Sequence, residues 1–443
     1  MVRNVNFDIK QNYVVKIKDA VTGVPILLDG KYPNWINVTK DITIRHYRKG
    51  QAGVCEITFN MLGDEGVIGG RGLLNKGDSR IAFKPDLGSL VTVIGTNVES
   101  VGTVIAEGVE RQMQSGPTVM FEGFIHTIDY NQDGEVRISC YDVLYYFKNK
   151  VFFKMEQNMN ALMVLKKIPD HMNSILGVGV NAGYTIYISP SFGSKYTFKY
   201  TLAQWEYGKS ALDLINWILG RAAMTGVISG TPLASYMNFY LDYMTKTIRI
   251  EPSEESIKRI DIVIGEGSLV QSYQISHSML DVCNCYYVTY DSASDDKQMH
   301  LGIYKEKQSI AQLGELQKWQ HFNAQDILLE GETGLGKTAI NNIAEGYVKH
   351  YNKPTTKLTI NAIGHCGVKA GYLIPVSIKG IDIVLDAQSK GNFALMVSTK
   401  VPLVLIDEVE HNITNDVHTM RIVSTVALNK YNTWSAVTKE EQP

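Results

Sequence analysis

Hydrophobic and polar residues alternate in short runs through the first third of the chain, a pattern typical of strands that bury one face. The early runs occupy residues 14–17, 42–47, 54–59 and 90–95. The runs 119–130 and 135–147 flank Asn131-Gln132-Asp133-Gly134. Asp-Gly favours a hairpin because both residues tolerate a positive φ. We therefore expect an antiparallel β domain over residues 1–155.

The middle of the chain changes to a helical period. Residues 156–176 and 210–225 place apolar side chains three and four positions apart, the spacing of one helix face. Aromatic-rich or β-branched runs lie between and after them, at residues 196–200, 237–243 and 247–250. We expect a helix-containing middle domain over residues 156–268.

Strand-like runs return after residue 269. They occupy residues 270–276, 284–290, 358–362, 372–378, 393–397, 403–406 and 418–428. Residues 339–351 have the one clear helical pattern here, which ends at Asn352-Lys353-Pro354. We expect a second antiparallel β domain over residues 269–443 with one inserted helix, so the fold class is mainly β (α+β).

Composition and charge narrow the class of protein. The chain has 443 residues, 44% hydrophobic and 20% charged, with a net charge of −2. This is the balance of a soluble globular protein, with no overall electrostatic attraction for nucleic acid or anionic membrane. No stretch approaches the ~18 apolar residues of a membrane span, and the N-terminus lacks the apolar run of a secretory signal. We expect synthesis in a cytoplasm, no membrane partner and no direct nucleic-acid specificity.

The cysteines do not suggest disulfide or metal chemistry. There are five, and an odd, scattered set without an export signal argues against a disulfide framework. Cys283 and Cys285 lack a second pair at zinc spacing. We expect buried free thiols, no metal site and no cofactor.

Two histidine motifs have a structural interpretation. His365 and Cys366 are adjacent, which in a strand points them to opposite faces and excludes a nucleophile–base pair. His411 and His418 flank residues 412–417. We expect them to hydrogen-bond that turn rather than bind a metal.

One motif points to a different function. Residues 331–338 read Gly331-Glu332-Thr333-Gly334-Leu335-Gly336-Lys337-Thr338. This pattern fits a phosphate-binding loop, in which glycines let backbone N–H groups approach an anion. The apolar run 403–406 ends in Asp407 and Glu408, which could bind a metal ion and activate water. The alternative function is therefore a P-loop ATPase using Gly331, Gly336, Lys337, Thr338 and Asp407 with Glu408.

The surrounding pattern disfavours this alternative. A phosphate loop works when a parallel sheet aims a helix N-terminus at the phosphates, and such a sheet needs several βαβ units. One helix and a series of short strands separate Thr338 from Asp407. That pattern indicates an antiparallel meander, so we expect no catalytic residues.

Several motifs, in order, resemble those of one family. They are Phe121-Glu122-Gly123-Phe124-Ile125 with residues 138–146; Gly208-Lys209-Ser210-Ala211 with residues 239–252; residues 278–284; Ser309-Ile310, Leu313-Gly314 and Gln317; residues 359–371; and Val409-Glu410-His411 with residues 416–420. The chain resembles the central baseplate hub proteins of contractile phage tails and phage-tail-like bacteriocins (the late-control-D type, related to type VI secretion spike hubs). Phe147, Tyr286 and Leu313 depart from the family's pattern.

The resemblance implies a non-enzymatic homotrimer made in a bacterial cytoplasm and assembled into a tail baseplate. Each subunit would contribute two tail-tube-like β-barrels, so that a pseudo-sixfold ring joins the sixfold tube to the threefold spike. The implied partners are the tube or tube-initiator protein, the central spike, other baseplate proteins and the tape measure protein. A hub with peptidoglycan hydrolase activity is a third alternative, although no fused domain is visible.

Overall fold

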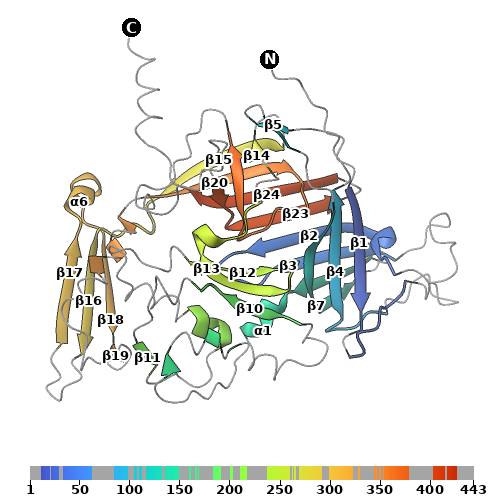
Figure 1. Ribbon diagram of the computed structural model, residues 1–443, viewed down its shortest axis with the longest axis horizontal. Coiled ribbons are helices and arrows are strands. Elements are labelled where there is room, and N and C mark those ends of the chain that lie inside the picture. Colours follow the sequence, from blue (N-terminus) through green and yellow to red (C-terminus); the bar gives the residue numbers. More distant parts are fainter. Residues whose placement is uncertain are drawn as a thin grey trace, which may run out of the picture.

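The computed structural model describes residues 11–19, 21–28, 33–61, 84–97, 104–106, 109–111, 116–131, 135–148, 159–160, 165–166, 168, 183–190, 200–202, 210–216, 237–259, 262, 264–265, 269–291, 299–322, 328–329, 344–345, 347–348, 351–352, 354–378, 403–414 and 417–426. Strands dominate these residues (Figure 1), which confirms the mainly β class.

The largest element is a ten-stranded sheet in which every neighbouring pair is antiparallel. Its strands, in spatial order, are β1 (Gln11–Lys18), β4 (Leu90–Asn97), β7 (Pro117–Tyr130), β8 (Glu135–Tyr141), β3 (Val54–Asn60), β2 (Thr39–Tyr47), β23 (Glu408–Thr414), β24 (Val417–Val426), β20 (Thr355–Ile363) and β15 (Val270–Ser278). The first six come from the N-terminal half and the last four from the C-terminal half. The two halves therefore meet in one sheet at the β2–β23 pair, which we call the seam.

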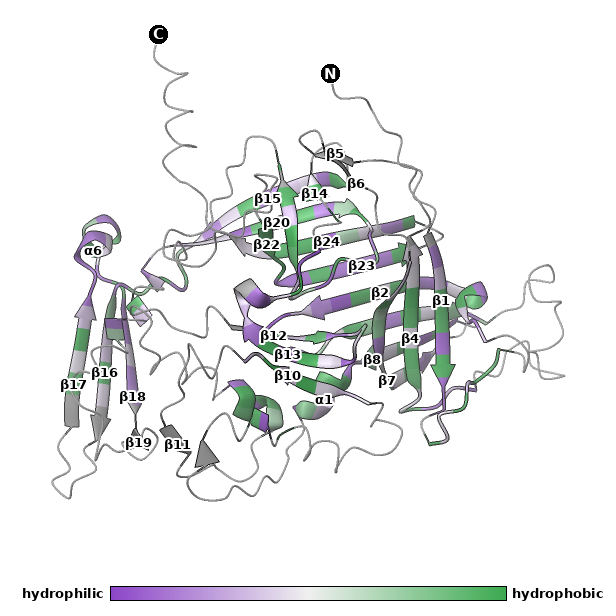
Figure 2. Cartoon of the chain, in the orientation of Figure 1, coloured by the Kyte–Doolittle hydropathy of each residue, from purple (hydrophilic) through white to green (hydrophobic). Residues whose placement is uncertain are grey.

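Alternating burial explains these strands. On β2 the buried residues are every second one from Ile42, and on β23 they are every second one from Val409. Side chains alternate between the two faces of a strand, so one face of each is buried and the other is partly open. Figure 2 shows the matching hydrophobic and hydrophilic bands along β2, β23 and β24.

Two hydrophobic cores contain buried residues of this sheet. One contains mainly residues of the N-terminal half and the middle region, together with Cys366 and Ile413 from the C-terminal half. The other contains mainly C-terminal residues together with Tyr240 from the middle region. The first core therefore buries residues from both sides of the seam.

Smaller sheets complete the described part. They are β10 (Thr185–Ile188), β13 (Thr247–Pro252) and β12 (Met237–Asp242); β19 (Leu328–Leu329), β11 (Tyr200–Leu202) and β9 (Met159–Asn160); β14 (Ile264–Gly265), β21 (Leu373–Ser377) and β22 (Leu403–Leu405); β17 (Met299–Lys305), β16 (Cys285–Asp291) and β18 (Gln317–Phe322); and β5 (Val104–Ala106) with β6 (Val109–Arg111). The described residues also form the helices α1 (Val143–Phe147) and α6 (Lys307–Leu313) and the 3-10 turns η1 (Ile36–Val38) and η2 (Ser253–Glu255). Figure 1 shows β17, β16, β18 and α6 beside the main body rather than within it.

Three local predictions are wrong. The strand predicted over 135–147 ends at Tyr141, because the Asp142 carboxylate accepts the Leu144 N–H and starts α1 there. The helix predicted from residue 156 is interrupted at Met159–Asn160, which pair with β11. A second C-terminal helix, α6, was not predicted; Glu306 caps its start and Gly314 follows its end. The predicted strand 393–397 lies outside the described residues, and the division into three domains stays a prediction.

Candidate functional site

The phosphate-loop motif cannot be placed, because residues 331–338 lie outside the described part of the chain. The strands expected to flank a nucleotide are described. β19 pairs antiparallel with β11, whereas β22 pairs antiparallel with β21 in a different sheet. Leu328 and Leu405 are therefore not on neighbouring parallel strands, the arrangement that a P-loop enzyme uses.

Asp407 and Glu408 have structural partners. Asp407 lies between β22 and β23, where Oδ1 is 2.5 Å from Nη2 of Arg48 and Oδ2 accepts the Thr425 N–H at 2.6 Å. Glu408 lies 3.9 Å from Arg421. Glu408 is the first residue of β23. Asp407 thus fastens the start of β23 to β24 and to the residue after β2.

A buried loop connects the regions on either side of the seam. Residues 364–372, which we call the plug loop, follow β20, and every one of them is buried. Lys369 donates to the Val119 carbonyl at 2.6 Å, Asn238 donates to the Gly371 carbonyl at 2.7 Å, and Tyr372 donates to Asp242 at 3.0 Å. The plug loop therefore bonds to β7 of the N-terminal half and to the β12–β13 hairpin of the middle region.

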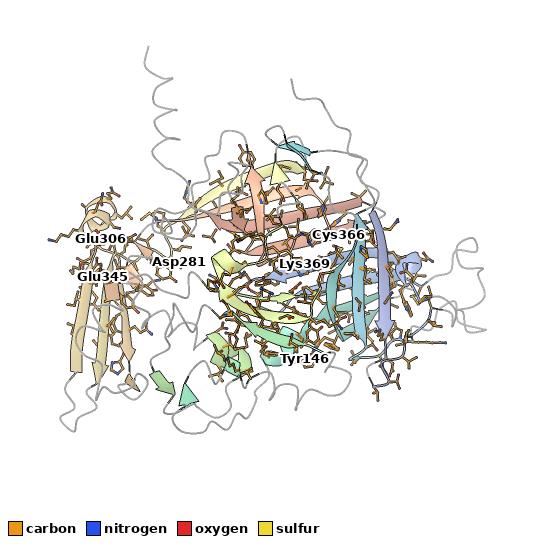
Figure 3. All side chains as sticks on the ribbon, viewed as in Figure 1. Tyr146, Asp281, Glu306, Glu345, Cys366 and Lys369 are labelled. Carbon is orange, nitrogen blue, oxygen red and sulfur yellow. The ribbon has the colours of Figure 1, made fainter. Side chains whose placement is uncertain are left out.

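Lys369 is an unusual component of this loop because it is buried. Its ammonium lies 5.6 Å from the Tyr243 ring centroid and 5.9 Å from that of Tyr372, within cation–π range. Burial lowers the pKa of Lys369 to about 8, while the charge of Asp242 acts in the opposite direction. Figure 3 shows Lys369 and Cys366 inside the main body, away from Asp281, Glu306 and Glu345.

His365 and Cys366 lie in the plug loop, so their expected place in a strand is wrong. Burial raises the pKa of the Cys366 thiol to about 12, which keeps it protonated and unreactive. All five cysteines are buried and free, as predicted.

Three buried histidines cross the seam on adjacent strands. His46 is on β2, His411 on β23 and His418 on β24, and we call them the imidazole file. His411 Nδ1 lies 3.0 Å from His418 Nε2, and His411 Nε2 lies 2.9 Å from the Val368 carbonyl oxygen. Both nitrogens of His411 are thus engaged away from residues 412–417, so the expected bond to that turn is wrong for His411.

The hydrogen bonds fix the protons of this pair. The Val368 carbonyl can only accept, so Nε2 of neutral His411 carries the hydrogen and Nδ1 accepts from the Nε2–H of His418. His46 is different, because no described group hydrogen-bonds either of its ring nitrogens. Its ring packs edge-on against Tyr243 and His411, with centroids 5.0 and 5.7 Å away.

The imidazole file is neutral near pH 7. Burial lowers the pKa of His411 to about 4, although its bond to Val368 acts in the opposite direction. Burial also lowers the pKa of His46 and His418 well below the usual range, and the neighbouring His411 adds to both effects.

Asp142 is a second buried polar centre. Its carboxylate accepts the Gly53 N–H at 2.7 Å, the Tyr243 hydroxyl at 2.8 Å and the Leu144 N–H at 2.9 Å. Burial raises the pKa of Asp142 to about 7, while these three bonds act in the opposite direction. The side chain ties the start of β3 and the end of β12 to α1.

The two outer strands of the ten-stranded sheet differ. The outer edge of β1 is covered, because Trp35 donates to the Val15 carbonyl and Ile26 to the Ile17 carbonyl, each at 2.8 Å. No described strand pairs with the outer edge of β15, whose sequence VQSYQISHS has no charged residue and no proline. Such an edge is a template for pairing with another chain.

The small β17–β16–β18 sheet also has an open face. On one face Tyr286 stacks on Tyr347, with ring centroids 4.1 Å apart. The strand registers put Ile303 and Trp319 beside Tyr287 on the other face. There Trp319 is 64% exposed, Leu301 53% and Ile303 44%. Exposed aromatic and aliphatic side chains grouped in this way are typical of protein contact surfaces.

Neither a metal cluster nor a membrane helix is found in the described ranges. No group of three or more His, Cys, Asp or Glu side chains there could hold a metal ion. No helix there has the length and hydrophobicity needed to cross a membrane.

Comparison with known proteins identifies the fold. The crystal structure of the tail protein from Neisseria meningitidis MC58 matches with a TM-score of 0.51 and 12% identity, covering 94% of this chain and 96% of that chain. The 43 kDa tail protein of prophage MuSo2 from Shewanella oneidensis matches with the same TM-score and identity, covering 94% and 97%. None of the curated proteins matches the sequence.

This fold confirms the resemblance to phage tail proteins that the sequence motifs indicated. The YQBQ-like family model matches residues 88–190 and 199–423, more than half of the chain. The protein therefore belongs to the YQBQ-like family and has the fold of phage tail proteins.

Proposed function

We propose that the protein is a structural baseplate hub, of which three copies form a ring between the sixfold tail tube and the threefold spike. The seam carries this proposal, because it places two strand-rich halves side by side within one copy. Two comparable units in each of three copies present six near-equivalent surfaces, which suits a ring that adapts one symmetry to the other.

The outer surfaces suit contacts with neighbours. The open edge of β15 can accept a strand from another copy, since its backbone groups need a partner. The apolar face around Trp319 can pack against the tube, the spike or another baseplate protein, including the tape measure protein. Catalysis has no part in this function, and Asp407 acts as a structural link to Arg48.

Oligomeric mass tests the proposal. We expect purified protein to give a trimer by mass photometry and by light scattering at micromolar concentration. A double substitution on the outer strand, Gln274→Lys with Ser276→Lys, should give a folded monomer, because lysines on a sheet edge oppose strand addition. Val417→Lys is the matched control, since Val417 is also an exposed strand residue but lies on β24.

Each result has a clear meaning. A wild-type monomer at every concentration would contradict the ring itself. If the Gln274→Lys, Ser276→Lys variant forms a trimer as well as the wild type does, the ring is still supported, but the β15 edge is not the contact between copies.

A further inference from the structure

The seam concentrates basic groups on its buried side. His46 and His411 come from the two strands that form the seam, and His418 comes from the strand beside them. Ile44 lies directly opposite His411, so His46 and His411 are diagonal neighbours. The same strands hold Ile42 and Ile413, which are paired and buried. The imidazole file thus replaces apolar packing at the point where the two halves meet.

Groups that face the file offer little compensation for added charge. His46 faces His411 from β23, Tyr243 from the end of β12 and Lys369 from the plug loop. His411 faces His418, His365 and Lys369, with Glu410 as the acidic neighbour on its own strand. His418 faces His411, His365 and the Tyr13 ring of β1.

The two nearby buried carboxylates are committed elsewhere. Asp142 accepts bonds from Gly53, Tyr243 and Leu144. Asp242 accepts bonds from Met244, Thr245 and Tyr372. Among the described residues neither bonds an imidazole of the file. A proton added to His46 or His411 would therefore place a positive charge near Lys369, and neither of these two carboxylates is hydrogen-bonded to it.

We propose that the seam is an acid-sensitive junction: when the imidazole file takes up protons, β2 and β23 separate while each half keeps its other strand pairs. A proton on His46 has no described acceptor to receive its hydrogen bonds. A proton on Nδ1 of His411 would point at the N–H of His418, so this bond would break or His418 would change tautomer. These two effects both act on the strands of the seam.

The direction of the pH dependence follows from linkage. The folded pKa of each of the three histidines lies below the usual value of 6.5, so the opened junction binds more protons than the closed one. The closed junction therefore keeps its full stability above about pH 6.5 and loses it as the pH falls towards about 4. The seam thus has two states, closed and separated, and proton uptake shifts the equilibrium towards the separated state.

Hydrogen exchange followed by mass spectrometry tests the proposal on the wild-type protein. As the pH is lowered from 7.5 to 3.5, with rates corrected for intrinsic exchange, amides of β2 and β23 should lose protection first. The amides of the β7–β8 hairpin should still be protected at the pH at which the amides of β2 and β23 have lost protection. Loss of protection at the same pH in both regions would overturn the proposal.

A variant makes the test specific. His46→Leu removes one protonation site and no described hydrogen bond, so the pH of seam opening should fall by roughly half a unit. The opening should also take up about two protons instead of about three. This number is the slope of the logarithm of the opening equilibrium constant plotted against pH. His126→Leu on β7 is the control, since His126 lies in the β7–β8 hairpin outside the seam, and it should leave both values unchanged. An unchanged opening pH in His46→Leu would overturn the proposal.

Discussion

Gly371→Ala is expected to lower the free energy of unfolding by about 2–5 kcal/mol. Gly371 has φ +85°, a conformation that costs an L-residue roughly 1–2 kcal/mol. A Cβ there would lie 2.3 Å from Cγ of the Tyr240 ring, and such overlap in a packed core costs about 1–3 kcal/mol. Tyr240 cannot simply swing away, because it is buried and its hydroxyl donates to Glu251 at 2.8 Å.

Urea unfolding followed by circular dichroism measures this loss. Gly23→Ala separates the two contributions, because Gly23 has φ +67° but no atom within 4 Å of an added Cβ. We expect Gly23→Ala to cost no more than about 1–2 kcal/mol. Equal losses in the two variants would contradict the packing of Tyr240 against the plug loop.

The second large effect is expected at Asp142. Asp142→Ala removes the acceptor of three buried hydrogen bonds, and a buried donor left without a partner costs about 1–3 kcal/mol. The three losses are not independent, because Tyr243 can rotate its hydroxyl. We therefore expect the free energy of unfolding, measured with urea, to fall by about 3–5 kcal/mol in total.

Two further variants control for the carboxylate itself. Asp19→Ala also removes an acceptor of backbone N–H groups, those of Val21 and Thr22, but at an exposed turn. Its loss should be much smaller, since water replaces the carboxylate. Asp142→Asn keeps one carbonyl acceptor and should fall between the wild type and Asp142→Ala. A stability of Asp142→Ala equal to that of the wild type would refute the role of this residue.

The pH dependence of Asp142 opposes that of the imidazole file. Its folded pKa of about 7 lies above the ordinary value of 3.8, so folding favours the protonated form between these values. Asp142 alone therefore makes the protein less stable as pH rises from about 4 to about 7. Its bonds to Gly53 and Leu144 lie within the N-terminal half, so this effect is separable from opening of the seam.

Local patterns predicted the strands better than their partners. The alternation of Ile42, Ile44 and His46 correctly indicates β2 with one buried face. Nothing in that alternation shows that the Thr43 hydroxyl will donate to the side-chain oxygen of Asn412. These two atoms lie 3.0 Å apart, although the residues are 369 positions apart in the sequence. Pairings over such distances depend on the whole fold, and they determine how the two halves are joined.

Features of the candidate site were predicted unevenly. The same alternation puts His46 in the buried phase of β2, and this signal could have identified the imidazole file. The plug loop could not be inferred in this way, because its burial comes from contacts with β7 and β12 rather than from any period of its own. The pattern ending in Asp407 misled because an apolar strand followed by a carboxylate also suits a structural link to arginine.

The ring can be tested most directly by its symmetry. Single-particle electron microscopy of the purified assembly should show a threefold particle with six strand-rich units around its axis, two from each copy. The seam should lie between the two units of one copy. A particle without threefold symmetry, or one in which the halves of a copy do not lie side by side, would contradict the proposed hub.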